Sequence, residues 1–132
     1  MDQITIKKFL KKMSQELEGE WILIGGSLLL ALGISNRVTI DIDLIPINEA
    51  TNKDSLKLMN ISTSLNMPPE TINLSSEYFL KKIDGWEKEL ILLQQTGKCT
   101  LYRPTKKLFR QLKEARGTST DLLDIEAYEK LK

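Results

Sequence analysis

Two carboxylates lie one residue apart, Asp41 and Asp43, in the segment RVTIDIDLI (37–45). The alternating β-branched residues of this segment predict a strand. Because successive side chains of a strand point to opposite faces, both carboxylates are expected on one face, with Ile40 and Ile42 on the core-facing side. Two like charges this close repel each other, and a divalent cation that binds both removes the repulsion. The alternative is a pair of solvent-facing aspartates on an ordinary amphipathic edge strand.

A glycine-rich stretch precedes these aspartates. The apolar run EWILI (20–24) predicts a buried strand, Gly25 and Gly26 a turn, and Ser27 the N-cap of a helix that Gly33 ends. Such a turn presents backbone N–H groups at the positive end of a helix dipole, which suits a phosphate, although Gly-Ser at a helix start also serves for capping alone. Beside a carboxylate pair that binds metal, it describes a site for a metal–nucleoside triphosphate, and therefore phosphoryl or nucleotidyl transfer.

The composition removes several other kinds of chemistry. The 132 residues include no histidine, which excludes nucleophilic sites that use serine or cysteine with histidine, and zinc sites that need imidazole. A single cysteine, Cys99, excludes an internal disulfide and thiolate zinc sites, and fits a reducing cytoplasm. Carboxylates, hydroxyls, lysines and arginines remain, and oxygen ligands favour Mg²⁺, Mn²⁺ or Ca²⁺. With a net charge of +1, the chain as a whole is not a basic nucleic-acid coat.

The remaining pattern predicts a small α+β domain that covers residues 1–132. Helices are expected in the first 18 residues, over 52–65 with Leu56, Met59 and Thr63 facing inward, over 75–84, from Pro104 to Gly117, and over 120–131. KELILLQQ and KCTLYR, separated by Thr96 and Gly97, predict a hairpin. This order is typical of a small mixed sheet with helices packed on it. No signal peptide or stretch long enough to span a membrane is seen, so a cytoplasmic location and no membrane partner are expected.

The glycine turn and the two aspartates together resemble the signature of nucleotidyltransferases of the DNA polymerase β-like superfamily, in particular the small prokaryotic branch that includes AbiE-type toxin proteins. That pattern is Gly-Gly-Ser/Thr, an apolar helix, then Arg-x-Ser/Thr-x-Asp-hydrophobic-Asp. It is filled by Gly25, Gly26, Ser27, Arg37, Thr39, Asp41 and Asp43. A second segment, LKEARGTSTDLLDI (112–125), is similar to a later element of the branch, and its matching residues are Lys113, Arg116, Asp121 and Asp124.

The resemblance implies a fold and an activity. In such enzymes Asp41 and Asp43 would bind Mg²⁺ or Mn²⁺ and act in catalysis, and a nucleoside monophosphate would move from a nucleoside triphosphate to a hydroxyl of RNA or protein. The implied nucleotide-binding residues are Gly25, Gly26, Ser27, Arg37, Thr39, Lys113 and Arg116. Because several members of the branch are toxins, an antitoxin partner and a stress or phage-defence role are expected as well.

The third carboxylate of such sites is the point where this sequence departs from the pattern. It is expected at the start of the strand after the middle helices, KELILLQQ (88–95), where Glu89 is the acid inside the strand. A different alignment places Asn73 near this point, and asparagine cannot act as a base. The third acid is therefore Glu89, absent, or supplied from elsewhere. Without a third acid, the protein would transfer nucleoside monophosphates poorly and would act as a module that binds a nucleotide or a partner protein.

Positive charge is concentrated between Lys98 and Arg116, with seven basic residues and one acid. On the helix expected there, Lys106, Arg110 and Lys113 form one stripe. The stripe is either the solvated face of an amphipathic helix or a wall that binds phosphates opposite the carboxylates.

Overall fold

The computed structural model describes residues 1–34, 39–116 and 119–131, and it confirms the α+β class. Its helices and strands are α1 (Gln3–Glu16), β1 (Gly19–Ile24), α2 (Gly25–Ala31), β2 (Ile42–Pro46), α3 (Asn52–Ser64), β3 (Ile72–Asn73), α4 (Glu77–Leu80), β4 (Leu90–Thr96), β5 (Cys99–Pro104), α5 (Lys106–Arg116) and α6 (Ser119–Glu129). Short 3₁₀ turns cover Pro69–Thr71 and Trp86–Lys88.

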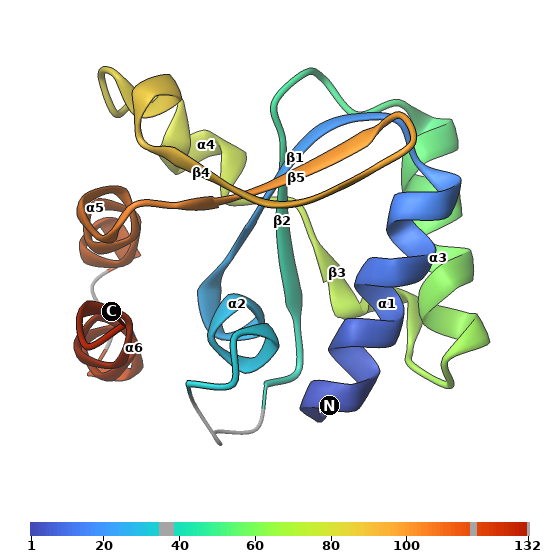
Figure 1. Ribbon diagram of the computed structural model, residues 1–132, viewed down its shortest axis with the longest axis horizontal. Helices are drawn as coiled ribbons and strands as arrows, with labels where there is room; N and C mark the ends of the chain where they lie inside the picture. The colour runs from blue at the N-terminus through green and yellow to red at the C-terminus, as the bar shows by residue number, and fades with distance from the viewer. Residues whose placement is uncertain (35–38, 117–118, 132) are drawn as a thin grey trace.

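The five strands form one mixed sheet in the order β3-β2-β1-β5-β4 (Figure 1). β1 lies at its centre, antiparallel to β2 and parallel to β5. The predicted hairpin is confirmed, since β4 and β5 pair antiparallel with an irregularity between Leu92 and Gln94. The two-residue β3 pairs parallel with β2 and was not expected from the sequence, because two residues are too few to show a period.

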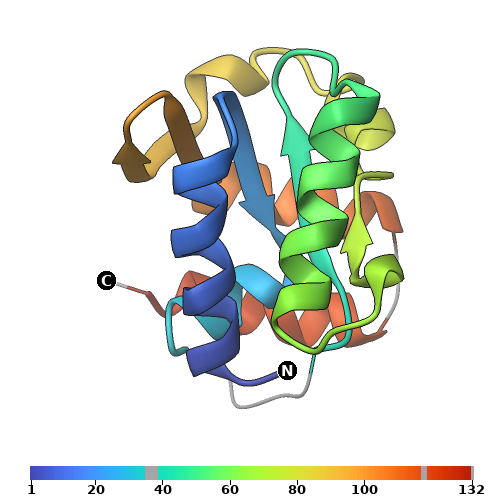
Figure 2. The ribbon, with the colours of Figure 1, turned by 90° about the vertical axis from the view of Figure 1, so that its right-hand side faces the viewer.

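Both faces of the sheet are covered. α1 and α3 lie side by side against one part of it, as the side view shows (Figure 2), and their buried residues join Trp21, Leu23 and Leu44 in one core. Ile22 and Ile45 face a second core with α4 and α5, which contains Trp86. Alternate residues of β1 and β2 therefore serve opposite cores, as the pleat of a strand requires.

The burial of several side chains can be compared with the prediction from the sequence. The tryptophans are core residues, as expected from their size. Cys99 is buried in β5, and burial raises the pKa of its thiol, so it is a packing residue. In α3 the prediction was wrong: Leu56 and Met59 are 56% and 39% exposed, and Thr63 is exposed.

The inward face of α3 is instead formed by Leu58, Ile61 and Ser62. These residues are spaced i, i+3, i+4, so α3 carries a second apolar stripe with the same helical period. Periodicity alone cannot choose between two such stripes. The choice is made by the neighbours of α3, which packs against α1 and β3.

The start of α3 makes a prediction about stability. Thr51 forms a capping box with Asp54, in which each side chain accepts a hydrogen bond from the other residue's N–H at 3.1 and 3.0 Å. Thr51→Ala should lower the free energy of unfolding by about 1 kcal/mol, because it removes one of these bonds. Urea denaturation would measure the change. Thr63→Ala in the same helix is the control, and an equal loss there would show that the cap contributes nothing special.

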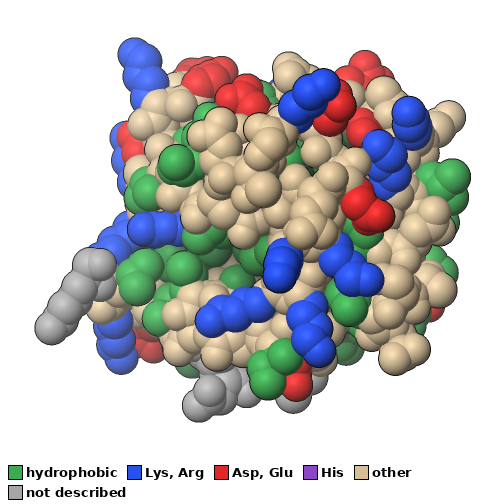
Figure 3. Space-filling model, turned by 45° about the vertical axis from the view of Figure 1, so that its right-hand side comes forward, with side chains coloured by type: hydrophobic (Ala, Val, Ile, Leu, Met, Phe, Trp, Pro, Cys, Tyr) green, Lys and Arg blue, Asp and Glu red, His purple; other side chains and the backbone are tan. Residues whose placement is uncertain are grey.

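The outward face of α1 is basic. Four lysines and one acid, Glu16, occur in this helix, whose start is capped by Asp2. The hydrogen bond that Asp2 accepts from the Thr5 N–H at 2.8 Å lowers the pKa of Asp2. Figure 3, which brings α1 to the front, shows Lys and Arg side chains gathered at the lower centre of this face. None of the described helices has the length and apolar character that a membrane crossing needs.

Candidate active site around Asp43

The backbone of Gly25 lies directly against the carboxylate of Asp43. Gly25 follows β1 without a linker, and Ile24 is paired with Asp43 across the antiparallel β1–β2 ladder. Gly25 has a φ of +71°, and a Cβ placed on it would lie 2.4 Å from Oδ2 of Asp43. Both the left-handed backbone and the close contact require glycine here. The carboxylate itself is only 6% exposed, so the turn and the strand form one packed unit.

Ser27 holds this unit together, and its predicted role as N-cap is wrong. The helix α2 begins at Gly25, so Ser27 is its third residue, and the cap residue Ile24 makes no side-chain hydrogen bond. The fully buried hydroxyl of Ser27 donates to the carbonyl of Ile24 at 2.8 Å and accepts from the N–H of Asp43 at 3.2 Å. It thereby ties the end of β1 to β2. Gly26, between the two, is half-buried.

Asn73 is the described neighbour of Asp43 on the adjacent strand. The two residues are paired in the parallel β2–β3 ladder, and Nδ2 of Asn73 donates to Oδ1 of Asp43 at 2.9 Å. Oδ1 of Asn73 accepts from the N–H and the hydroxyl of Ser75 at 3.0 and 2.6 Å. The amide oxygen therefore points away from Asp43. The place beside Asp43 where a second carboxylate could share a metal holds an N–H donor.

Glu89, the expected third acid, lies elsewhere in the molecule. It ends the 3₁₀ turn before β4, accepts a hydrogen bond from the hydroxyl of Thr105 at 2.7 Å, and pairs with Lys107 at 3.8 Å. β1 and β5 separate β4 from β2 in the sheet. Glu89 was expected near Asp43 because the strand that follows it was expected beside β2. The β4–β5 hairpin instead pairs with the other edge of β1, and the short β3 pairs with β2. Among the described residues, no group of three acids or cysteines could hold a metal ion.

Asp41 is not part of the strand that carries Asp43, because β2 begins one residue later, at Ile42. Asp41 is exposed and lines a second pocket, together with Met1, Thr5 and other residues at the start of α1 and the end of α3. Its neighbour Ile40 was expected in the core and is 79% exposed. β2 is not an amphipathic edge strand either, since every one of its residues is buried.

The C-terminal segment reaches the same site through Lys113. This side chain of α5 is 5% exposed and lines a small cavity with Gly25, Ser76 and apolar residues that include Phe109. Its Nζ donates to Oδ2 of Asp124 in α6 at 2.8 Å, and Asp124 is 2% exposed. The two segments that resembled a known pattern, far apart in the sequence, therefore meet where Lys113 and Gly25 face one cavity.

A comparison with protein-family models gives a match over nearly the whole chain. A family model described as "Nucleotidyltransferase of unknown function (DUF6036)" matches residues 3–131. The chain belongs to this nucleotidyltransferase family. No curated protein and no solved structure matches it. The family supports the nucleotidyltransferase part of the resemblance, and the AbiE-type branch stays a prediction.

The basic stripe of α5 in this nucleotidyltransferase does not act as one wall. Lys113 is buried, whereas Lys106 and Arg110 are exposed. Arg110 forms ion pairs with Glu114 at 2.8 Å and with Glu129 at 2.5 Å, and its hydrogen bond with Glu114 raises its pKa, as does the charge of Glu129. Arg110 is therefore engaged at the surface, whereas Lys113 is paired with Asp124 inside the protein and lines the cavity that Gly25 also lines.

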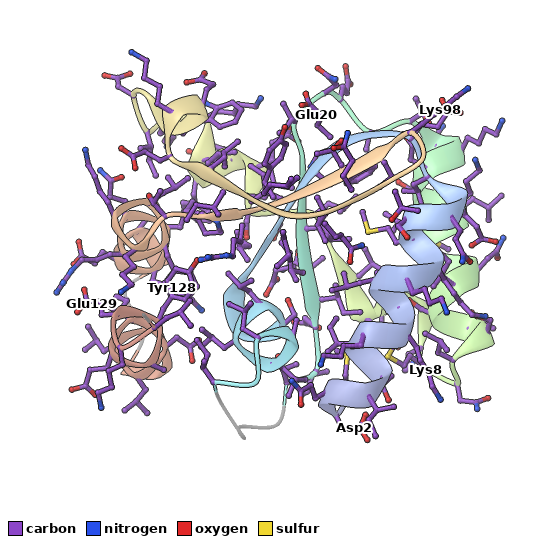
Figure 4. All side chains as sticks on the ribbon, in the orientation of Figure 1. Asp2, Lys8, Glu20, Lys98, Tyr128 and Glu129 are labelled. Atoms are coloured by element: carbon purple, nitrogen blue, oxygen red, sulfur yellow. The ribbon has the colours of Figure 1, made fainter. Side chains whose placement is uncertain are left out.

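α6 is fixed so that Asp124 can reach Lys113. The hydroxyl of Tyr128 donates to the carbonyl of Pro104 at 2.5 Å and accepts from Nη1 of Arg103 at 2.9 Å. Its ring packs against Phe109 with centroids 4.3 Å apart. Burial raises the pKa of Tyr128, and Arg103 opposes that shift. Tyr128 lies between α5 and α6 (Figure 4) and joins the two helices that carry the ion pair.

Four residues that the sequence analysis named remain to be placed. Arg37 and the side chains of Arg116 and Asp121 lie outside the described residues. Thr39 is half-buried near the second pocket, and its carbonyl accepts from the N-terminal amine at 3.3 Å. The sequence left Asn73 as an alternative for the third position, and its apolar neighbours in the alternating segment TINLSS were the signal that could have placed it on a strand.

Proposed function

We propose that this nucleotidyltransferase binds a nucleoside triphosphate with Mg²⁺ or Mn²⁺ and transfers the nucleoside monophosphate to a hydroxyl of RNA or protein. The observation that carries the proposal is the cavity shared by Gly25 and Lys113, beside the carboxylate of Asp43. The cavity has room for about one water and is lined mostly by apolar side chains, so we place the phosphate groups at its Lys113 and Gly25 end and the rest of the nucleotide outside. Lys113 would act there as a point charge, held in place by Asp124.

The donor set fits a magnesium ion of the kind that substrates help to bind. Mg²⁺ is commonly held by one or two carboxylates, with waters and substrate phosphates as its other ligands, so Asp43 alone would suffice, and Asp41, two residues before it, is the candidate for a second ligand. When bound, the metal would neutralise the triphosphate and polarise the phosphorus that is attacked. Asp43 is the more ordered of the two, because Gly25, Asn73 and Ser27 contact it.

The transfer also needs a proton acceptor. The acceptor hydroxyl attacks the α-phosphorus, the bond to the bridging oxygen breaks, pyrophosphate leaves, and the hydroxyl proton passes to a base. Asn73, next to Asp43, cannot take this proton. We assign it to the exposed carboxylate of Asp41, which would then have to act both near the metal and as a base.

Asn73 also favours a second candidate function. A site with an amide in this position retains a triphosphate-binding lysine and a buried carboxylate, and it lacks a third acid beside them. The second candidate is therefore a module that binds a nucleotide, or a partner protein, without turnover. An antitoxin partner, a defence role and a cytoplasmic location are predictions that rest on the resemblance to the AbiE-type branch.

Thermal unfolding with each ribonucleoside triphosphate, in Mg²⁺ or in chelator, tests the binding site. Ligand at 100 times its dissociation constant should stabilise the wild type by about 2.7 kcal/mol, and the stabilisation should need the metal. Asp43→Asn should abolish it while keeping the volume and the contact with Asn73. Asp84→Asn, an exposed position, is the matched control. Metal-dependent stabilisation that survives Asp43→Asn would refute the site.

Release of pyrophosphate and transfer of an α-phosphate label distinguish the two candidate functions. The enzyme should release pyrophosphate in a reaction that Asp43→Asn abolishes. Binding without any release would leave the non-catalytic module as the function.

Asn73→Asp gives a further expected result. The variant replaces a donor to Asp43 by a second carboxylate, so in chelator it should be less stable than the wild type by about 2 kcal/mol. Millimolar Mg²⁺ should restore much of this loss, because the two carboxylates can then share the ion. Thermal unfolding in chelator and in Mg²⁺ measures both effects. Asn60→Asp, an exposed change of the same charge in α3, should show neither, and an Asn73→Asp variant indifferent to Mg²⁺ would contradict the metal assignment.

A further inference from the structure

We infer that the lysine face of α1, formed by Lys7, Lys8, Lys11 and Lys12, docks the phosphate backbone of a single-stranded RNA and directs it to Asp41. The inference rests on the proposed function, since it names the acceptor of that site. Its basis is the arrangement of charge on α1 and the pocket at the end of that helix.

The four lysines occupy the side of α1 that faces away from the core. Ile6, Phe9 and Met13, fully buried, form the opposite side. Within the described residues, Lys7, Lys8 and Lys11 take part in no ion pair. The chain has a net charge of only +1, so four lysines on one face of a single helix stand out from its average charge.

The spacing of the lysines suits successive phosphates. Lys7 and Lys11, and likewise Lys8 and Lys12, are four residues apart, which is about 6 Å along the helix axis. Stacked nucleotides place one phosphate about every 3.4 Å along the axis of a strand, so the two rungs of lysines match phosphates about two positions apart. Lys8 is labelled on α1 in Figure 4.

The lysine face leads to the pocket that contains Asp41. Thr5, one helical turn before Lys8, lines this pocket together with Asp41 and with Leu65 and Asn66 after α3. Lys12 leans toward the same side, where its Nζ donates to the hydroxyl of Ser64 at 3.1 Å. A strand bound along Lys12 and Lys8 would therefore bring its end to the pocket that Asp41 lines.

RNA fits this face better than a protein or a membrane does. Protein interfaces are depleted in lysine and anchored by aromatic residues, and the aromatic residue of α1, Phe9, is buried in the core. A helix that inserts into a lipid surface must expose its apolar side, and the apolar side of α1 is covered by the sheet and by α2 and α3. A phosphate backbone needs only the cations.

The test is the salt dependence of RNA binding, without nucleotide or metal. A fluorescent single-stranded RNA of mixed sequence would be titrated at several salt concentrations with the wild type and with Lys7→Gln/Lys8→Gln/Lys11→Gln. Each lost phosphate contact lowers the slope of log affinity against log salt by about 0.7, so the triple variant should lose about 2 from the slope and bind at least about tenfold more weakly at low salt. Its melting temperature should match the wild type, since within the described part of the chain these three exposed side chains make no ion pair or hydrogen bond, and glutamine suits a helix as well as lysine.

The matched control is Lys82→Gln/Lys88→Gln/Lys130→Gln, which removes the same charge from exposed positions elsewhere. An equal loss in both triple variants, or no loss in the α1 variant, would overturn the inference. So would binding of the wild type to vesicles of anionic phospholipid with no binding to RNA.

A failure of the proposed function gives a different result. If the α1 variant loses RNA binding while the wild type neither binds nor consumes a triphosphate, the docking face is supported and the proposed transfer reaction is refuted. If transfer to this RNA occurs, the α1 variant should raise its KM for RNA and leave kcat unchanged. A change in kcat with an unchanged KM would count against docking.

Discussion

Gly25→Ala is expected to destabilise the protein strongly and to remove nucleotide binding. A left-handed backbone costs a non-glycine residue about 1–2 kcal/mol. The added Cβ would also lie 2.4 Å from Oδ2 of Asp43, a distance at which the carboxylate has to move. Together these should lower the free energy of unfolding by about 3 kcal/mol or more. Urea denaturation measures the stability, and metal-dependent thermal shifts with triphosphates measure the binding.

Gly85→Ala is the control for the backbone contribution. Gly85 has a φ of +76°, close to that of Gly25, and a Cβ there would meet nothing within 4 Å. The difference between the two variants isolates the contact with Asp43. Adding Asp43→Ala should reduce the cost of Gly25→Ala to that of Gly85→Ala. If Gly25→Ala lowers the free energy of unfolding by the same amount with and without Asp43→Ala, and by as much as Gly85→Ala does, the close approach of Gly25 to the carboxylate does not affect stability.

The buried ion pair of Lys113 and Asp124 gives the second large effect. Lys113→Met leaves a carboxylate buried without this cation, and Asp124→Leu does the converse. Each single variant should lower the free energy of unfolding by about 3–5 kcal/mol. Replacing both residues together should cost much less than the sum, since two apolar side chains can fill the space without an uncompensated charge. Chemical denaturation of the four proteins measures this double-mutant cycle.

The exposed pair of Arg110 and Glu114 is the control for this cycle. Solvent and salt screen it, so Arg110→Gln should leave the stability almost unchanged. Two additive single effects at Lys113 and Asp124 would contradict the pairing. The double variant also separates folding from function, because a folded protein without Lys113 should no longer be stabilised by a triphosphate.

The sequence predicted most of the elements, because long segments such as α1, α3, α5 and the β4–β5 hairpin show several periods of their pattern. Local pattern could not predict which strand lies beside β2. The order β3-β2-β1-β5-β4 is set by long-range pairing, and it decides that Asn73 and not Glu89 contacts Asp43. The pattern likewise could not place the start of β2, and one residue at that boundary separates Asp41 from the strand.

The candidate site was predicted in its parts and not in its contacts. Gly25 lies against Asp43 and lines one cavity with Lys113, which the two resembling segments contribute. The partner of Lys113 is Asp124, which the sequence indicated as a salt-bridging or capping residue. Ser27 took a different role because α2 starts three residues earlier than its sequence suggested, so the hydroxyl binds the strands and not the helix end.

The assembly of the site from both ends of the chain has a consequence for biosynthesis. Gly25 and Asp43 leave the ribosome early, whereas Lys113 and its partner Asp124 are added about 70–100 residues later, after several seconds of translation. The central strand β1 is likewise synthesised well before β5, the strand with which it pairs in parallel. A nascent chain therefore carries the carboxylate half of the site without the lysine half. The two halves of the site can meet only after α5 and α6 have been synthesised and have packed together.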